Sequence, residues 1–378
     1  MAALYQYHSD SNYLGFKMKH TTILILLLFL SAGRIMAQSP VKAPPKPVHD
    51  TAAKTGKDKK PRQSDEIAYN KGLEHFSKKD YISALSSFNE AIAGSPEFES
   101  AYLARANTYL RQKDYQNAAT DYKAALKIDS TDEKAWYGLG QAEITLGHSK
   151  EALIAFTYCI KKNPGNGDAW YCLGELEARA HNYKDALTDF TSAIGAKTNF
   201  AEAYNDRGIC NYELGNYNAS ADDYKQSLAF AKTADAYNNL GNAENKLGSN
   251  DGAIDAFSQA ITIDPKYADA YNNRGADYLD KKNYSDALAD FSKAIALDSV
   301  NAFAYCNRAL AEYRMNDLDR AQVDCDKAVE LKPEYGAAYL NRGIVEEMLR
   351  CEKDACNDWH KAAQYGIKVA NDYVKDCK

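Results

Sequence analysis

The sequence predicts an all-α solenoid of stacked helical hairpins, and three observations support this. A small residue recurs at intervals of 34 residues, with one interval of 33. Twelve residues after each lies Ala or Ser, and sixteen residues after it lies an aromatic residue or, once, Cys325. Such a fixed period indicates supersecondary units that bury their apolar faces only by stacking. The recurring small residues are Gly72, Ala106, Gly140, Gly174, Gly208, Gly241, Gly275, Ala309 and Gly343.

The first 64 residues lie outside this period. Residues 1–37 resemble a secretory signal, since Lys19 and His20 precede the apolar run Ile23–Leu30 and the small residue Ala37 ends it. Met18 is an alternative start. The run is too short to remain as a transmembrane anchor, although a retained signal anchor is the alternative reading. Residues 38–64 are rich in Pro and Lys and predict a disordered linker.

The unit 268–301 shows how each hairpin is expected to form. Tyr271, Gly275 and Tyr278 follow helical spacing on a first helix, and Lys281–Asn283 form a polar turn. Apolar residues from Tyr284 onward then follow the same spacing on a second helix. Proline ends the second helix in several units because its ring cannot continue the hydrogen-bond ladder. These prolines are Pro96, Pro164, Pro265 and Pro333.

This small–large–small pattern with a terminal proline resembles the tetratricopeptide repeat. The resemblance implies a right-handed superhelix in which the first helix of each hairpin lines a concave groove that binds proteins. Nine tetratricopeptide-type units are predicted in residues 65–366, followed by a capping helix at 367–378. Their ranges are 65–98, 99–132, 133–166, 167–200, 201–233, 234–267, 268–301, 302–335 and 336–366.

Two residue types vary together among the units. Five units carry arginine directly before the small first-helix residue, and all five carry aspartate sixteen residues after that arginine. The pairing predicts a part-buried, bidentate salt bridge between the two helices of a hairpin. A ligand site is the alternative. The pairs are Arg105 and Asp121, Arg207 and Asp223, Arg274 and Asp290, Arg308 and Asp324, and Arg342 and Asp358.

Asparagines form a stripe around the small first-helix residue of the later units. The stripe resembles the asparagine ladder in the repeat domain of O-linked N-acetylglucosamine transferase, which implies carboxamides that hold the backbone of an extended peptide. The alternative is that the asparagines bond neighbouring repeats. The predicted ligand-binding residues are Asn205, Asn238, Asn239, Asn242, Asn272, Asn273, Asn307 and Asn341.

The C-terminal cysteines predict a disulfide. Cys356 lies ten residues before Gly366 and Cys377 lies eleven residues after it, so two antiparallel helices would bring them level. An exported protein meets oxidising conditions, which favour the disulfide. A zinc site that joins Cys356 and Cys377 to Cys351 and His360 is the alternative.

Charge and motifs exclude two classes of function. The chain has a formal net charge of −6, and its first 64 residues carry ten Lys and Arg against three Asp, which leaves −13 for residues 65–378. An acidic array repels phosphates and argues against nucleic acid as a partner. Acids expected in the groove likewise argue against a partner's C-terminal carboxylate, and they are Asp206, Glu213, Asp235, Asp269 and Asp280. Catalytic motifs are missing, so we expect no enzymatic activity, cofactor or metal.

The expected function is a non-enzymatic scaffold or adaptor of the cell envelope. It would be exported to the periplasm or secreted, and it would bind a protein or extended peptide in its groove. One alternative is a structural or assembly component that acts through its convex face. Another is a glycan-handling accessory protein, because asparagine and tyrosine also suit sugars.

Overall fold

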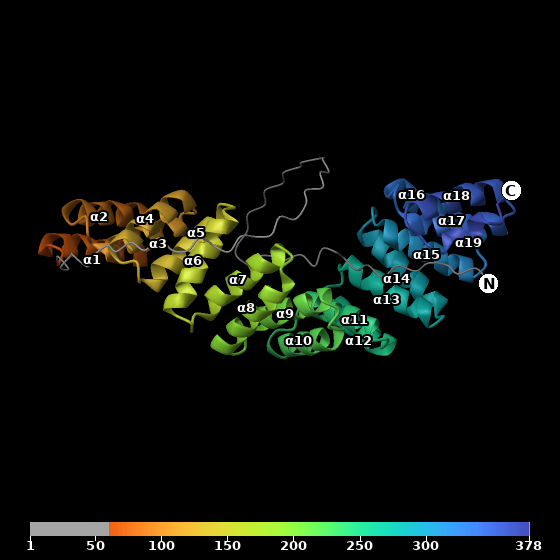
Figure 1. The fold of residues 1–378 in the computed structure, drawn as a ribbon, viewed down its shortest axis with the longest axis horizontal. Coiled ribbons are helices and arrows are strands. Elements are labelled where there is room, and N and C mark those ends of the chain that lie inside the picture. Colours follow the sequence, from red (N-terminus) through yellow and green to blue (C-terminus); the bar gives the residue numbers. More distant parts are fainter. Residues whose placement is uncertain (1–59, 378) are drawn as a thin grey trace. The chain divides into compact units, whose positions relative to one another are not determined.

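The computed structural model describes residues 60–377, and all the regular secondary structure in this part of the chain is helical (Figure 1). The signal prediction and the linker up to residue 59 lie outside the described residues. Two compact units can be distinguished, an N-terminal unit of residues 60–162 and a C-terminal unit of residues 163–377. Both are built from consecutive antiparallel hairpins, so the prediction of an all-α solenoid of hairpins is confirmed.

The N-terminal unit contains three hairpins. Their helices are α1 (Gln63–Ser77) and α2 (Tyr81–Gly94), α3 (Glu99–Arg111) and α4 (Tyr115–Ile128), and α5 (Glu133–Thr145) and α6 (Ser149–Lys162).

The C-terminal unit contains six hairpins and a short last helix. The first three hairpins are α7 (Gly167–Arg179) with α8 (Tyr183–Ala196), α9 (Ala201–Glu213) with α10 (Tyr217–Phe230), and α11 (Ala234–Lys246) with α12 (Asn250–Ile263). The remaining helices are α13 (Ala268–Asp280), α14 (Tyr284–Leu297), α15 (Ala302–Arg314), α16 (Leu318–Leu331), α17 (Gly336–Met348), α18 (Glu352–Gln364) and α19 (Ala370–Val374).

The small first-helix residue and the ring sixteen residues later explain the close packing of the hairpins, except that Cys325 replaces the ring between α15 and α16. A Cβ added at Gly275 would lie 2.7 Å from the Phe291 ring, and one added at Gly140 would lie 2.6 Å from the Phe156 ring. Both rings are fully buried. The absence of a side chain at the glycine therefore lets the second helix approach until the ring fills the space between the helices.

Each hairpin turns through one residue in the left-handed region. The turn uses Gly147, Gly215 and Gly248 in three hairpins, and residues such as Lys282 (φ 61°) and Asn316 (φ 63°) in others. This conformation ends the first helix, because the backbone N–H groups that follow bond back to its last carbonyls.

The element boundaries depart from the prediction in two places. Helix α1 begins at Gln63, two residues before the expected start of the array, and Arg62 forms a salt bridge with Asp65 in its first turn. At the other end, the capping helix is shorter than expected and spans only Ala370–Val374. This short helix still packs against α18.

The 33-residue interval also has a clear location. Three residues join α10 to α11, whereas four join α8 to α9 and α12 to α13. The missing residue therefore lies after Ser227, in the connection that ends at Thr233. The Thr233 hydroxyl accepts a bond from the N–H of Ala236 and caps α11. Within residues 60–377, no helix is both long and apolar enough to cross a membrane.

Candidate functional site

The first helices of the C-terminal unit form the candidate site. Helices α7, α9, α11 and α13 pack in series, each against the next. Positions six before, two before, one after and five after the small first-helix residue share one side of a helix, because they are spaced by three or four residues. We call the exposed part of this side in α7, α9, α11 and α13 the first-helix face.

A ladder of polar side chains joins each of these first helices to the next. The residue two before the small residue bonds to the residue three before it in the preceding hairpin. Asn273 donates to Asn238 at 3.2 Å and Asn307 donates to Asn272 at 3.1 Å. Asn239 donates to Asn205 at 3.4 Å, and Asn341 donates to Cys306 at 3.3 Å. A bond between these two positions therefore occurs at five successive junctions between first helices. At the first of these junctions the bonded residues are Tyr171 and Asp206.

The ladder corrects the ligand-binding prediction for the asparagine stripe. Asn272, Asn273 and Asn307 have no exposed surface, and Asn238, Asn239, Asn242 and Asn341 are also buried. Their carboxamides bond one another between repeats, which is the alternative that the sequence left open. Asn273 also donates to Asn242 at 3.2 Å. A fully buried side chain offers no surface to a peptide, so ligand contact stays a prediction only for the half-buried Asn205.

The first step of the ladder is acidic. The Tyr171 hydroxyl donates to Asp206 at 2.7 Å, and Asn205 donates to the same carboxyl at 3.0 Å. Burial raises the pKa of Asp206 to about 6, although these two bonds act in the opposite direction. Burial and the neighbouring Asp206 raise the pKa of Glu175 to about 7. This junction therefore gains protons on folding near neutral pH, unlike its uncharged neighbours.

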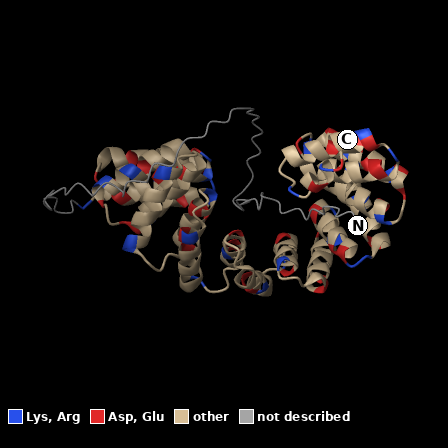
Figure 2. Ribbon diagram, turned by 45° about the vertical axis from the view of Figure 1, so that its right-hand side comes forward, with Lys and Arg blue, Asp and Glu red and all other residues tan. Residues whose placement is uncertain are grey.

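Acidic side chains dominate the first-helix face. Six acids on four consecutive helices occupy the positions six before and five after the small residue, against two cations, Arg179 and Lys246. Five of the acids are exposed and Asp269 is half-buried. Acidic residues mark successive helices of this unit in Figure 2. The six are Asp168, Glu202, Glu213, Asp235, Asp269 and Asp280.

The predicted salt bridges between the helices of a hairpin are confirmed. In all five pairs the guanidinium donates to its aspartate through two nitrogens, at 2.5 to 3.2 Å. The sequence analysis missed a third bond. Nη1 of each arginine donates to a side chain on the second helix of the preceding hairpin, as Arg274 does to Ser258 at 3.0 Å. The others are Asn89, Thr191, Ser292 and Asp326, each sixteen residues before its arginine.

The C-terminal cap is held by a covalent bond. Cys356 and Cys377 form a disulfide with their Cα atoms 5.7 Å apart. Cys356 is thus unavailable as a zinc ligand, and Nδ1 of His360 lies 2.7 Å from the Cys356 carbonyl oxygen. Within residues 60–377, no group of three or more His, Cys, Asp or Glu side chains is placed to hold a metal ion.

Sequence models of known families match much of the array. A model described as TPR repeat matches residues 107–147 and 241–279. Two models described as tetratricopeptide repeat match residues 268–299 and 302–335, and residues 137–199 and 173–234. None of the curated proteins compared with the chain matches it.

Solved structures share the fold. The C-terminal part of a TPR repeat-containing protein from Cytophaga hutchinsonii is 16% identical, with a TM-score of 0.54 over 63% of this chain and 98% of that chain. A chain of the APC/C hetero-tetramer Cut9–Hcn1 is 13% identical, with a TM-score of 0.53 over 83% of this chain and 76% of that chain. YrrB, described as a TPR protein with an unusual peptide-binding site, is 26% identical with a TM-score of 0.37 over 57% of this chain and 95% of that chain.

Proposed function

Because the chain belongs to the tetratricopeptide repeat family, whose members typically mediate protein–protein interactions, we propose that it is a non-enzymatic interaction scaffold. The binding surface is the first-helix face of α7, α9, α11 and α13, and the partner contributes an extended, basic or neutral segment. The observation that carries this proposal is the series of acids on four consecutive first helices.

The charge of the face determines which partners it favours. Glu202, Glu213 and Asp235 are exposed, so they attract a basic segment and repel a carboxylate tail. Exposed charges act mainly on association rate and selectivity, because solvent and salt screen them. The binding energy therefore requires apolar or aromatic contacts as well.

The buried ladder joins the helices that carry the first-helix face. Carboxamide bonds are directional, so they hold each first helix in one register against its neighbour. A scaffold whose first helices keep a constant spacing presents its acids at regular intervals, which lowers the entropic cost of binding an extended segment.

The proposal includes export to the cell envelope. The apolar run near the N-terminus supports it, as does the Cys356–Cys377 disulfide, since such bonds persist in oxidising compartments. Fractionation of cells that express the full chain tests this point. Recovery of the protein in the cytoplasm with its leader intact would contradict export.

Photo-crosslinking tests the binding surface. A photoreactive phenylalanine analogue is introduced at Glu202 or Asp235 on the first-helix face, and at Asp222 or Lys293 on exposed positions of second helices. We expect one partner to be captured from the first two positions only. Capture from the second-helix positions alone would favour a structural component that acts through the opposite face.

A charge exchange then tests the chemistry with the purified partner. The double variant Glu202→Lys/Asp235→Lys is expected to weaken binding at least tenfold at low ionic strength. The matched control, Asp222→Lys/Asp255→Lys, makes the same change in net charge on exposed second-helix positions and is expected to bind within twofold of the parent protein. If the two variants weaken binding equally, the loss comes from the change in net charge of the protein and not from the acidic face.

A further inference from the structure

A glutamate recurs three residues after the small residue of the first helix in five hairpins. It is Glu143 on α5, Glu177 on α7, Glu244 on α11, Glu312 on α15 and Glu346 on α17. Glu143, Glu312 and Glu346 are buried, and the Glu244 side chain is 16% exposed. A carboxylate in such surroundings is costly unless a cation or hydrogen-bond donors compensate for its lost hydration.

Two of these glutamates are bound by a lysine from the preceding hairpin. Nζ of Lys123, on α4, lies 2.5 Å from Oε1 of Glu143, and Nζ of Lys225, on α10, lies 2.8 Å from Oε1 of Glu244. Each lysine directly follows the ring residue of its second helix, Tyr122 or Tyr224. The repeat position directly after the ring residue can thus place an ammonium group beside the glutamate of the next hairpin.

Glu312 lacks that lysine, as do Glu177 and Glu346. The equivalent position, directly after Phe291, holds Ser292, whose hydroxyl accepts a bond from Nη1 of Arg308. Arg308 cannot substitute for the lysine, because its other two bonded nitrogens both donate to Asp324. Glu312 is 7% exposed, and its Oε2 is buried without a hydrogen-bond partner.

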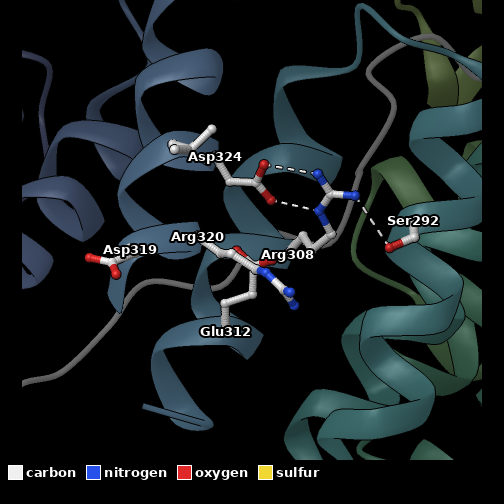
Figure 3. Close-up of a pocket in the computed structure, with 7 residues that line it drawn as sticks. Ser292, Arg308, Glu312, Asp319, Arg320 and Asp324 are labelled. Atoms are coloured by element: carbon white, nitrogen blue, oxygen red, sulfur yellow. Dashed lines mark hydrogen bonds and ion pairs between the residues drawn. The ribbon is translucent and has the colours of Figure 1, made fainter. Parts of the chain in front are cut away.

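An open cavity of about 500 Å³ adjoins this carboxyl (Figure 3). Ser292 of α14 lines it on one side, and Asp319, Arg320 and Val323 of α16 line it on another. Arg308 and Glu312 reach it from α15, which lies between those two second helices in the chain. The cavity therefore opens between consecutive second helices, on elements other than the first-helix face.

We propose that this cavity binds a lysine side chain of a partner protein, with its ammonium group on Glu312 in the position that Lys123 and Lys225 occupy elsewhere in the chain. The Glu312 carboxylate, which lines the cavity, is the acceptor. Asp319 and Arg320 also line the cavity and contribute one negative and one positive charge, and the exposed Val323 offers an apolar surface to the lysine methylenes. The site uses none of the residues of the first-helix face, so its failure and that of the proposed function are separable.

Binding at this site is expected to depend on pH. Burial raises the pKa of Glu312 to about 7, and the carboxylates of Asp324 and Asp317 act in the same direction, while Arg308 and Arg320 oppose them. An ammonium group binds the ionised carboxylate, so protonation of Glu312 competes with the lysine. Affinity should therefore fall as the pH is lowered from about 8 to 6.

The direct test uses a capped peptide, acetyl-Gly-Ser-Lys-Ser-Gly-amide, and its norleucine analogue with the full chain. Saturation-transfer NMR detects weak binding of such probes. We expect signal on the lysine methylenes, at least tenfold weaker binding in Glu312→Gln, and no change in the matched control Glu334→Gln, which removes the same charge from an exposed residue outside the cavity. Equal binding of the norleucine peptide, or an unchanged affinity in Glu312→Gln, would overturn the proposal.

A second variant tests the proposal independently, in case Glu312→Gln does not fold. Ser292→Lys restores the lysine found at the other two junctions, and it is expected to fill the site, block the peptide and raise the melting temperature. The reverse change, Lys225→Ser, is expected to leave Glu244 open and add a second peptide site. A Ser292→Lys protein that folds and still binds the lysine peptide as the parent does would contradict the assignment.

Discussion

The two units bury different chemistry between their first helices. From the second hairpin of the C-terminal unit onward, the position two before the small residue holds Asp206 or an asparagine, and each bonds to the preceding hairpin. In the N-terminal unit, the same position holds the exposed Asn70, then Ala104 and Gly138. Gly138 leaves room for Tyr122, because an added Cβ would lie 2.3 Å from that ring. The first helices of the C-terminal unit are therefore joined by a hydrogen-bonded ladder, whereas the same positions of the N-terminal unit hold no such ladder.

The exposed sides of the same helices differ as well. At the positions six before and five after the small residue, the N-terminal unit has one acid, Glu66, and two cations, Lys134 and Arg111. Helices α7 to α13 have six acids and two cations at these positions. The directional ladder and the acidic face thus occur in the same part of the chain. Apolar packing is enough to hold neighbouring repeats together. The directional hydrogen bonds of the ladder also fix how each first helix lies against the next, in the part of the chain that we propose to bind a partner.

The largest expected effect is common to both units. Replacing Phe156 or Phe291 by Ala removes a fully buried ring between packed helices and should cost about 3–5 kcal/mol in each unit. Hydrogen exchange of the affected hairpin measures the change locally. A cost below about 1 kcal/mol at either site would show that the two units do not share this core.

The disulfide should distinguish the end of the C-terminal unit. Cys377→Ser opens a loop of 21 residues and should lower the stability of the last hairpin by on the order of 3 kcal/mol. Hydrogen exchange in α17 and α18 reports the loss. The control is Cys351→Ser, which changes an exposed thiol nearby and should leave exchange unaltered.

The asparagine ladder offers the sharpest contrast between the units. Asn273→Ala removes the donor to Asn238 and Asn242 inside a buried junction, which should cost about 1–3 kcal/mol. Asn70→Ala at the same repeat position is exposed and should change stability by less than about 0.5 kcal/mol. If Asn273→Ala instead weakens partner binding and leaves the melting temperature unchanged, the ladder has been assigned the wrong role.

The smallest effect concerns pH. The raised pKa of Asp206 means that the folded protein binds more protons than the unfolded chain between about pH 4 and 6, so this residue makes stability fall as pH rises through that window. Arg179, Glu202 and Glu175 surround the carboxyl and modify the size of the effect. Asp206→Asn replaces the ionisable group with the carboxamide found in the later hairpins. Its stability relative to the parent should therefore increase from pH 5 to pH 8, as measured by thermal unfolding. A pH-independent difference would contradict this account.

Features within one hairpin were accessible from the sequence because their partners lie at a fixed, short separation. Gly275 and Phe291 are sixteen residues apart, as are Arg274 and Asp290, and a hairpin of two regular helices brings such positions together wherever it occurs. Cys356 and Cys377 followed from the same reasoning, even though α19 proved shorter than predicted.

Features between hairpins depended on the tertiary structure. The composition of the asparagine stripe was evident, but whether Asn273 faces a ligand or Asn238 depends on how closely α13 approaches α11, and no local pattern specifies that distance. The same holds for Glu312, whose position in the repeat is identical to that of Glu143, while only one of them has a lysine in reach. Helical periodicity determines which side of a helix a residue occupies. Whether that side is solvent, cavity or interface is decided by the packing of the next helix, since burial is a property of neighbours and not of the residue itself.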